Sequence, residues 1–189
     1  MTLTAEAATG TAAETQHVDV LVVGAGISGI GAAYHLKQQF PDKSFVILDA
    51  LDARGGTWWT HRYPGVRSDS DLFTFGYKFK PWRGASIATS DEILSYLDEV
   101  IQENDLGDRI RYRHRVSAAS WSSEEKRWTV QVTREDTGES LRFTTDFLWM
   151  CQGYYDHSRP HQPQWEGLDR FRGHVVHPQQ WPADLDYAG

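Results

Sequence analysis

Residues 17–29 read HVDVLVVGAGISG, and this stretch decides the fold. Its first seven residues are a β-branched run ending at a glycine, the pattern of a strand buried on both faces of a parallel sheet. Residues 30–40, IGAAYHLKQQF, then place apolar side chains at helical spacing until Pro41 ends the helix. Residues 44–48, SFVIL, predict a second buried strand that closes on Asp49. Residues 17–49 therefore predict one β-α-β unit with a right-handed crossover.

The turn between this strand and this helix carries three glycines in the spacing GxGxxG. Gly24 permits the tight turn, Gly26 lets backbone amides approach a pyrophosphate, and Gly29 lets the helix pack closely on the strand. The pyrophosphate would lie at the positive end of the helix dipole. Asp49 stands where an acid accepts hydrogen bonds from ribose hydroxyls. Since strand, glycines, helix and acid follow in the required order, the pattern predicts dinucleotide binding rather than an ordinary glycine-rich turn.

The rest of the chain divides into loops, one helix and a run of strands. Residues 53–82 are dense in Gly, Trp, Tyr and Pro, while residues 90–104, SDEILSYLDEVIQEN, predict an amphipathic helix with Thr89 or Ser90 as its N-cap. Residues 109–151 alternate as strands, and Asp136-Thr137-Gly138 predicts a hairpin turn between two of them. We therefore expect an α/β fold in which a Rossmann-like unit is combined with an antiparallel β-meander.

Composition excludes several classes of function. The 189 residues carry a net charge of −7, which argues against a nucleic-acid or anionic-membrane partner. Cys151 is the only cysteine, so neither an intramolecular disulfide nor a CxxC pair can form. No apolar run approaches the roughly 20 residues that span a bilayer, and the Ala/Thr-rich start has no secretory pattern. We expect a cytoplasmic protein with no integral membrane segment and no metal site.

The β-α-β unit by itself leaves FAD and NAD open. Residues 54–58, RGGTW, resemble the glycine pair that follows the first β-α-β unit in glutathione-reductase-like FAD domains, where the chain passes close to the flavin. The strands that end at residues 151–153, CQG, also resemble that fold, in which a later strand returns to the nucleotide. Both resemblances favour FAD.

Two longer motifs resemble one family, the Baeyer–Villiger monooxygenases. Residues 55–69, GGTWWTHRYPGVRSD, match a signature of that family at every fixed position, and residues 62–82 are especially similar to its ethionamide-activating branch. Residues 171–182, FRGHVVHPQQWP, match the FxGxxxHxxxWP fingerprint, which in relatives links the FAD part to the NADP part. The resemblance covers residues 18–185.

This resemblance implies an FAD- and NADPH-dependent monooxygenase that inserts one oxygen of O2 into a ketone to give an ester or lactone, with sulfides as further substrates. It implies that Asp69 lies near the flavin and orients a catalytic cation. It implies FAD contacts from Gly24, Gly26, Ile27, Ser28, Gly29, Asp49, Gly56, Thr57, Trp58, Asp69 and Val116. The linker fingerprint consists of Phe171, Gly173, His177, Trp181 and Pro182, and we expect its histidine to organise domains rather than transfer protons.

The sequence departs from the family in carrying a single GxGxxG. Relatives have a second such motif for NADP shortly after HxxxWP, an active-site arginine further on, and a C-terminal strand that completes the FAD domain. We therefore expect a disordered lead over 1–16, the N-terminal portion of an FAD domain over 17–153, a linker over 154–189, no NADP domain, and no turnover by these residues alone.

Two other functions stay open on the sequence. One is an N- or S-oxygenating flavin monooxygenase, and the other is a non-catalytic FAD-binding or partner-binding module. On spacing alone, Trp58, Trp59, Tyr63 and Trp181 are equally well explained as packing aromatics.

Overall fold

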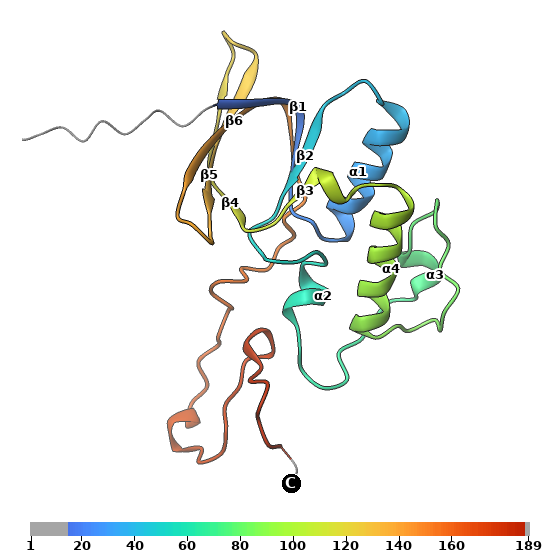
Figure 1. Cartoon of the computed structure of the whole chain (residues 1–189). Coiled ribbons are helices and arrows are strands. Elements are labelled where there is room, and N and C mark those ends of the chain that lie inside the picture. The colour runs from blue at the N-terminus through green and yellow to red at the C-terminus, as the bar shows by residue number, and fades with distance from the viewer. Residues whose placement is uncertain (1–14, 188–189) are drawn as a thin grey trace, which may run out of the picture.

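The structure is a computed structural model that describes residues 15–187 (Figure 1). Its strands form one mixed sheet in the order β3-β2-β1-β6-β5-β4. These are β1 (Thr15–Val23), β2 (Phe45–Leu48), β3 (Ile110–Arg111), β4 (His114–Ser122), β5 (Arg127–Arg134) and β6 (Ser140–Met150). Strand β1 runs parallel to both β2 and β6, whereas β4, β5 and β6 form an antiparallel meander. The predicted α/β fold with a Rossmann-like unit and a meander is confirmed.

Two long helices, α1 (Ile27–Gln39) and α4 (Ser90–Glu103), lie together on one side of the sheet (Figure 1). The loops between them hold two short helices, α2 (Thr57–Thr60) and α3 (Leu72–Phe75). Single 3₁₀ turns occur at Gly107–Arg109, Leu168–Arg170 and Pro178–Gln180. The side chains of α1 and α4 bury one face of β1 and β2 in the larger of two apolar cores.

The second half of strand β1, residues 20–23, is apolar without interruption because both of its faces are covered. Val20 and Val22 point into the core under the helices, whereas Leu21 points into a second core that contains Val130 and Phe143 of the meander. The meander therefore covers the face of the parallel strands that the helices leave open. Alternating residues of a strand point to opposite faces, so such double coverage requires a continuous apolar run.

The first strand begins at Thr15, two residues inside the predicted lead of 1–16. The difference arises because β6 is 11 residues long and offers pairing partners to Thr15 and Gln16. The Gln16 side chain also accepts a hydrogen bond of 2.6 Å from Arg111. The remainder of the predicted lead, residues 1–14, lies outside the described residues.

The predicted helix cap and hairpin turn are confirmed. The Thr89 hydroxyl accepts from the Glu92 amide, and the Glu92 carboxylate accepts from the Thr89 amide at 2.8 Å, so the two residues form a capping box. The hairpin closes with the Arg134 amide donating to the Glu139 carbonyl at 2.9 Å, and Gly138 has a φ of 73°.

After β6 the chain is irregular and runs away from the sheet, as the orange and red trace in Figure 1 shows. Within residues 15–187, no helix is long and apolar enough to cross a membrane. In the same range, no group of three or more His, Cys, Asp or Glu side chains is arranged to hold a metal ion.

Candidate dinucleotide-binding site

A cavity of about 360 Å³ opens at the carboxyl ends of the three adjacent parallel strands β1, β2 and β6. This edge of a parallel sheet is where open α/β folds bind ligands. Nine of the residues predicted to bind the dinucleotide line it: Gly24, Gly26, Ile27, Ser28, Asp49, Gly56, Thr57, Trp58 and Val116. Gly29 and Asp69 are the two predicted residues that do not.

The three glycines of the turn differ in what surrounds them. Gly24 has a φ of 106°, and a Cβ there would lie 2.6 Å from the Cys151 carbonyl oxygen, so this glycine lets the end of β6 close against the turn. A Cβ on Gly29 would lie 1.8 Å from the Gly24 carbonyl oxygen. Around Gly26, in contrast, a Cβ would meet nothing within 4 Å, because its α-carbon faces the cavity. Only Gly26 therefore has free space in front of it for a ligand.

Asp49 fixes the turn to the loop after β2. One carboxylate oxygen accepts from the Ala25 amide at 2.6 Å and the other from the Leu51 amide at 2.8 Å. The side chain is 7 % exposed, and this burial raises the pKa of the carboxyl, although the two amide hydrogen bonds oppose the rise. The carboxylate thus borders the cavity while its position is set by backbone groups.

The GGTW segment is fastened to the same turn. The Gly55 amide donates to the Ala25 carbonyl at 2.9 Å, and Gly56, with a φ of 53°, begins helix α2. Arg54 holds this segment to α4 through two hydrogen bonds to the Asp98 carboxylate. Thr57 and Trp58 line the cavity from this segment.

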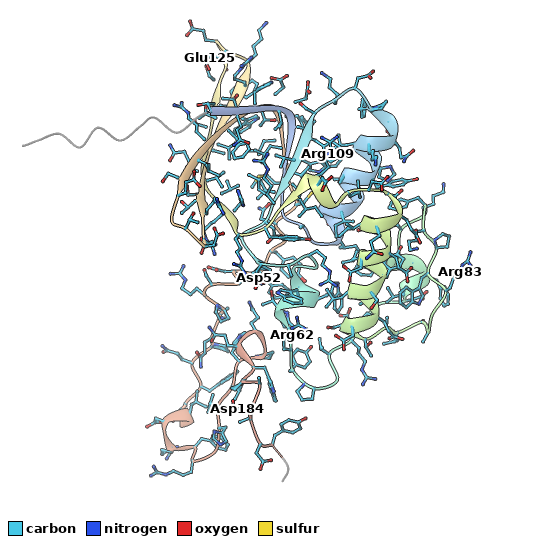
Figure 2. All side chains as sticks on the ribbon, viewed as in Figure 1. Asp52, Arg62, Arg83, Arg109, Glu125 and Asp184 are labelled. Carbon is cyan, nitrogen blue, oxygen red and sulfur yellow. The ribbon has the colours of Figure 1, made fainter. Side chains whose placement is uncertain are left out.

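The neighbouring Trp59 packs outside the cavity. Asp52 and Arg62, both labelled beside α2 in Figure 2, hold its ring: the indole nitrogen donates to Asp52 at 3.1 Å, and the Arg62 guanidinium lies 4.1 Å from the ring centroid. This residue is therefore a packing aromatic, one of the two interpretations that the sequence left open.

Asp69 lies outside the cavity. Its side chain is exposed and accepts a hydrogen bond of 3.2 Å from the Ser70 hydroxyl, whereas the preceding Ser68 is buried and accepts from the Ala88 amide. The motif thus places Asp69 in the loop before α3, and its carboxylate does not line the cavity.

The linker fingerprint is also outside the cavity. Phe171 is 59 % exposed, and a Cβ on Gly173 would meet the Phe171 ring at 2.6 Å. The Nδ1 atom of His177 accepts from the Gln179 amide at 3.2 Å, while its Nε2 lies 3.1 Å from the His161 carbonyl and donates to it. Trp181, before Pro182, packs edge-on against Tyr187 with ring centroids 5.8 Å apart.

Several cavity residues were not predicted, and they include two groups away from the glycine turn and Asp49. His114 and Arg115 lie at the start of β4 beside Val116, and their place next to that predicted residue is the signal that could have found them. The other group is the wall formed by residues 151–158 after β6, of which only 151–153 were connected with the nucleotide by their resemblance. Residues 155–158 carry no periodicity or motif that marks them.

Comparison with known proteins finds similarity in both sequence and fold. Residues 22–87 match the family model of an NAD(P)-binding Rossmann-like domain. The chain is 51 % identical over 176 residues to the FAD-containing monooxygenase EthA of Mycolicibacterium smegmatis, an alignment that covers 93 % of this chain and 35 % of that protein.

Two solved structures show the same fold. An oxidized steroid monooxygenase bound to NADP is 35 % identical with a TM-score of 0.72, over 89 % of this chain and 32 % of that one. A cyclohexanone-bound cyclohexanone monooxygenase is 30 % identical with a TM-score of 0.75, over 93 % of this chain and 33 % of that one. In sequence and in fold, the chain therefore resembles the N-terminal portion of FAD-containing monooxygenases, and it spans about 35 % of the length of the curated relatives that it matches.

Proposed function

We propose that this chain is the FAD-binding portion of an FAD- and NADPH-dependent monooxygenase of the Baeyer–Villiger type. The whole protein would insert one oxygen of O2 into a ketone to give an ester or lactone, with sulfides as further substrates. The observation that carries the proposal is the cavity that joins the glycine turn, Asp49 and the GGTW segment. The matched relatives support it, since one is named as FAD-containing and the solved structures carry NADP and cyclohexanone.

The residues of the cavity fit the parts of FAD. The open space at Gly26 lets a pyrophosphate approach the amides at the start of α1, where the helix dipole favours negative charge. Asp49 borders the same space and would accept hydrogen bonds from ribose hydroxyls. Val116 would line the adenine end, and Thr57 and Trp58 the end toward the flavin. When bound, FAD supplies the transfer of electrons from NADPH to O2, and the chain's residues hold it and shield it from water.

Asp69 and the linker fingerprint have different roles in this proposal. Asp69 acts outside the nucleotide cavity as a positioning residue, and its carboxylate orients a cation near the flavin. Phe171, Gly173, His177, Trp181 and Pro182 belong to a linker proposed over residues 154–189, of which 188 and 189 lie outside the described residues. Both ring nitrogens of His177 form hydrogen bonds with backbone groups, so neither is free to exchange a proton with a substrate. This supports a structural role for His177.

The first test is a visible absorption spectrum of the purified chain after incubation with FAD and desalting. We expect oxidised-flavin bands to remain with the protein at a ratio near one per chain. A chain that is folded by circular dichroism but loses all flavin on desalting would contradict the proposed FAD site.

The second test concerns the reaction and uses the whole protein. With NADPH, O2 and a cyclic ketone we expect the lactone as product, alongside sulfoxide when a sulfide is supplied. Sulfoxide or N-oxide formation without any lactone would instead favour the heteroatom-oxygenating alternative.

A further inference from the structure

His157 lies in the wall of the dinucleotide cavity and has no role in the function proposed above. Its side chain is half-buried, and it lines the cavity together with Asp49 and the glycine turn. Its Nδ1 atom is buried and has no hydrogen-bond partner among residues 15–187. A buried polar atom without a partner is unfavourable, so the folded chain leaves one hydrogen-bonding position here that a ligand can satisfy.

Burial favours the neutral form of the His157 imidazole. Burial is the largest influence and lowers the pKa of His157, and His61 adds to this, while the carboxylates of Asp49 and Asp156 act in the opposite direction. A neutral imidazole offers one donor and one acceptor. Ribose hydroxyls also donate and accept, so they are suitable partners for such a ring beside a carboxylate.

The backbone that carries His157 is held in place by its neighbours. One carboxylate oxygen of Asp156 accepts from the Ser158 and Arg159 amides, both at 3.0 Å, which closes a tight turn around His157. The Gln179 side chain donates to the Asp156 carbonyl at 3.2 Å, and the Gln179 amide donates to His177 of the linker fingerprint. The fingerprint is thereby connected to the cavity wall.

We propose that His157 is a dinucleotide-binding residue whose imidazole hydrogen-bonds the ribose of the adenosine half of FAD beside Asp49, and that Gln179 positions the turn that carries it. This inference rests on the proposed FAD site and assigns a further contact within it. It also gives the linker fingerprint a second role. His177 accepts a hydrogen bond from the backbone amide of Gln179, and the Gln179 side chain in turn donates to Asp156 in the cavity wall.

The test is the dissociation constant of FAD for the full 189-residue chain, measured by isothermal titration calorimetry. For His157→Phe, which keeps a flat ring without polar atoms, we expect about tenfold weaker binding, the value of one hydrogen bond. For His157→Gln, which keeps a donor and an acceptor, we expect binding within about threefold of wild type. His174→Phe is the matched control, because His174 is exposed in the same irregular segment and does not line the cavity. It should leave the affinity unchanged.

The outcomes separate the inference from the function on which it rests. Unchanged FAD binding by His157→Phe, with a wild-type chain that binds FAD, overturns the role of His157 alone. Tighter binding by the same variant also overturns it, because the imidazole would then occupy space that the ligand needs. A wild-type chain that binds no FAD overturns both proposals. The thermal midpoint without FAD, measured for each variant, should not fall below the wild-type value, whereas loss of a purely structural histidine would lower that midpoint and leave the affinity unchanged.

Discussion

Alanine substitutions of the two glycines at the start of α1 should affect different properties. We expect Gly29→Ala to lower the stability of the fold and Gly26→Ala to weaken FAD binding. At Gly29 a new methyl group would lie 1.8 Å from the Gly24 carbonyl oxygen, which is backbone and cannot rotate away. The turn or the helix must therefore shift by more than an ångström. Overpacking of this kind costs about 3 kcal/mol, and for a chain of this size that lowers the thermal midpoint by roughly 6–12 °C.

At Gly26 the same methyl group meets nothing within 4 Å, and its φ of −78° is open to any residue. Alanine is a poorer N-cap than glycine but restricts the unfolded chain, and these two effects of opposite sign leave the stability within about 1 kcal/mol of wild type. The methyl group would instead occupy the space where the pyrophosphate approaches the turn. We expect FAD binding to weaken by about 10- to 100-fold, the affinity equivalent of forcing an extra methyl group into a packed site.

The assays are a thermal melt by circular dichroism without FAD and a calorimetric titration with FAD, each on both variants. We expect Gly29→Ala to lower the thermal midpoint and Gly26→Ala to lower the affinity for FAD. A Gly29→Ala chain as stable as wild type would refute the close packing of helix and turn. A Gly26→Ala chain that binds FAD like wild type would refute the placement of the ligand in front of Gly26.

Three further outcomes are expected. Thr89→Ala removes the α4 capping box and should lower the free energy of unfolding by about 1 kcal/mol in urea titrations, whereas Thr89→Ser should stay within a few tenths. Burial raises the pKa of Asp49, so its contribution to stability is complete below the unfolded-state value near 3.9 and is lost as the pH rises through the higher folded-state value. The unfolding free energy of wild type should therefore fall relative to Asp49→Asn as the pH is raised from 4 to 7, and an equal pH dependence of the two chains would contradict this. Asp69→Asn should leave FAD affinity within about twofold of wild type, because the carboxylate is exposed outside the cavity and a lost exposed contact is worth little; a tenfold loss in the titration would place it in the nucleotide site.

The parts of the fold that could be predicted from the sequence depend on neighbours close in the chain. The strand, the glycine turn and the helix over residues 17–39 follow from an apolar run, the GxGxxG spacing and the helical spacing of apolar residues, all within one short stretch. The start of β1 could not be predicted in the same way, because Thr15 pairs with Arg142 of β6, far away in the chain. Helix α3 was missed because it is a single turn held by a side chain, with Asp71 accepting from the Phe73 amide.

The candidate site likewise has one part that could be predicted from the sequence and one part that could not. The glycine turn and Asp49 could be predicted because each stands at a strand end that the topology brings to one edge of the sheet, and the GGTW segment was predicted through its resemblance to FAD domains. The wall that contains His157 could not, because its position depends on a hydrogen bond between Gln179 and Asp156, two residues in irregular segments. The motif marks Asp69 by its position in the chain, and its carboxylate accepts from the neighbouring Ser70 outside the cavity.

The predicted motifs of the cavity form one unit through the backbone of Ala25. Its amide donates to Asp49 and its carbonyl accepts from Gly55, so a single fully buried residue ties the glycine turn to the end of β2 and to the GGTW segment. A change in any one motif therefore displaces the hydrogen-bonding partners of the other two. Substitutions at Asp49 and Gly55 should for this reason show coupled effects on FAD affinity in a double-mutant cycle, because groups in one hydrogen-bond network are not independent. Folding itself builds the nucleotide cavity, and the ligand needs only to enter it.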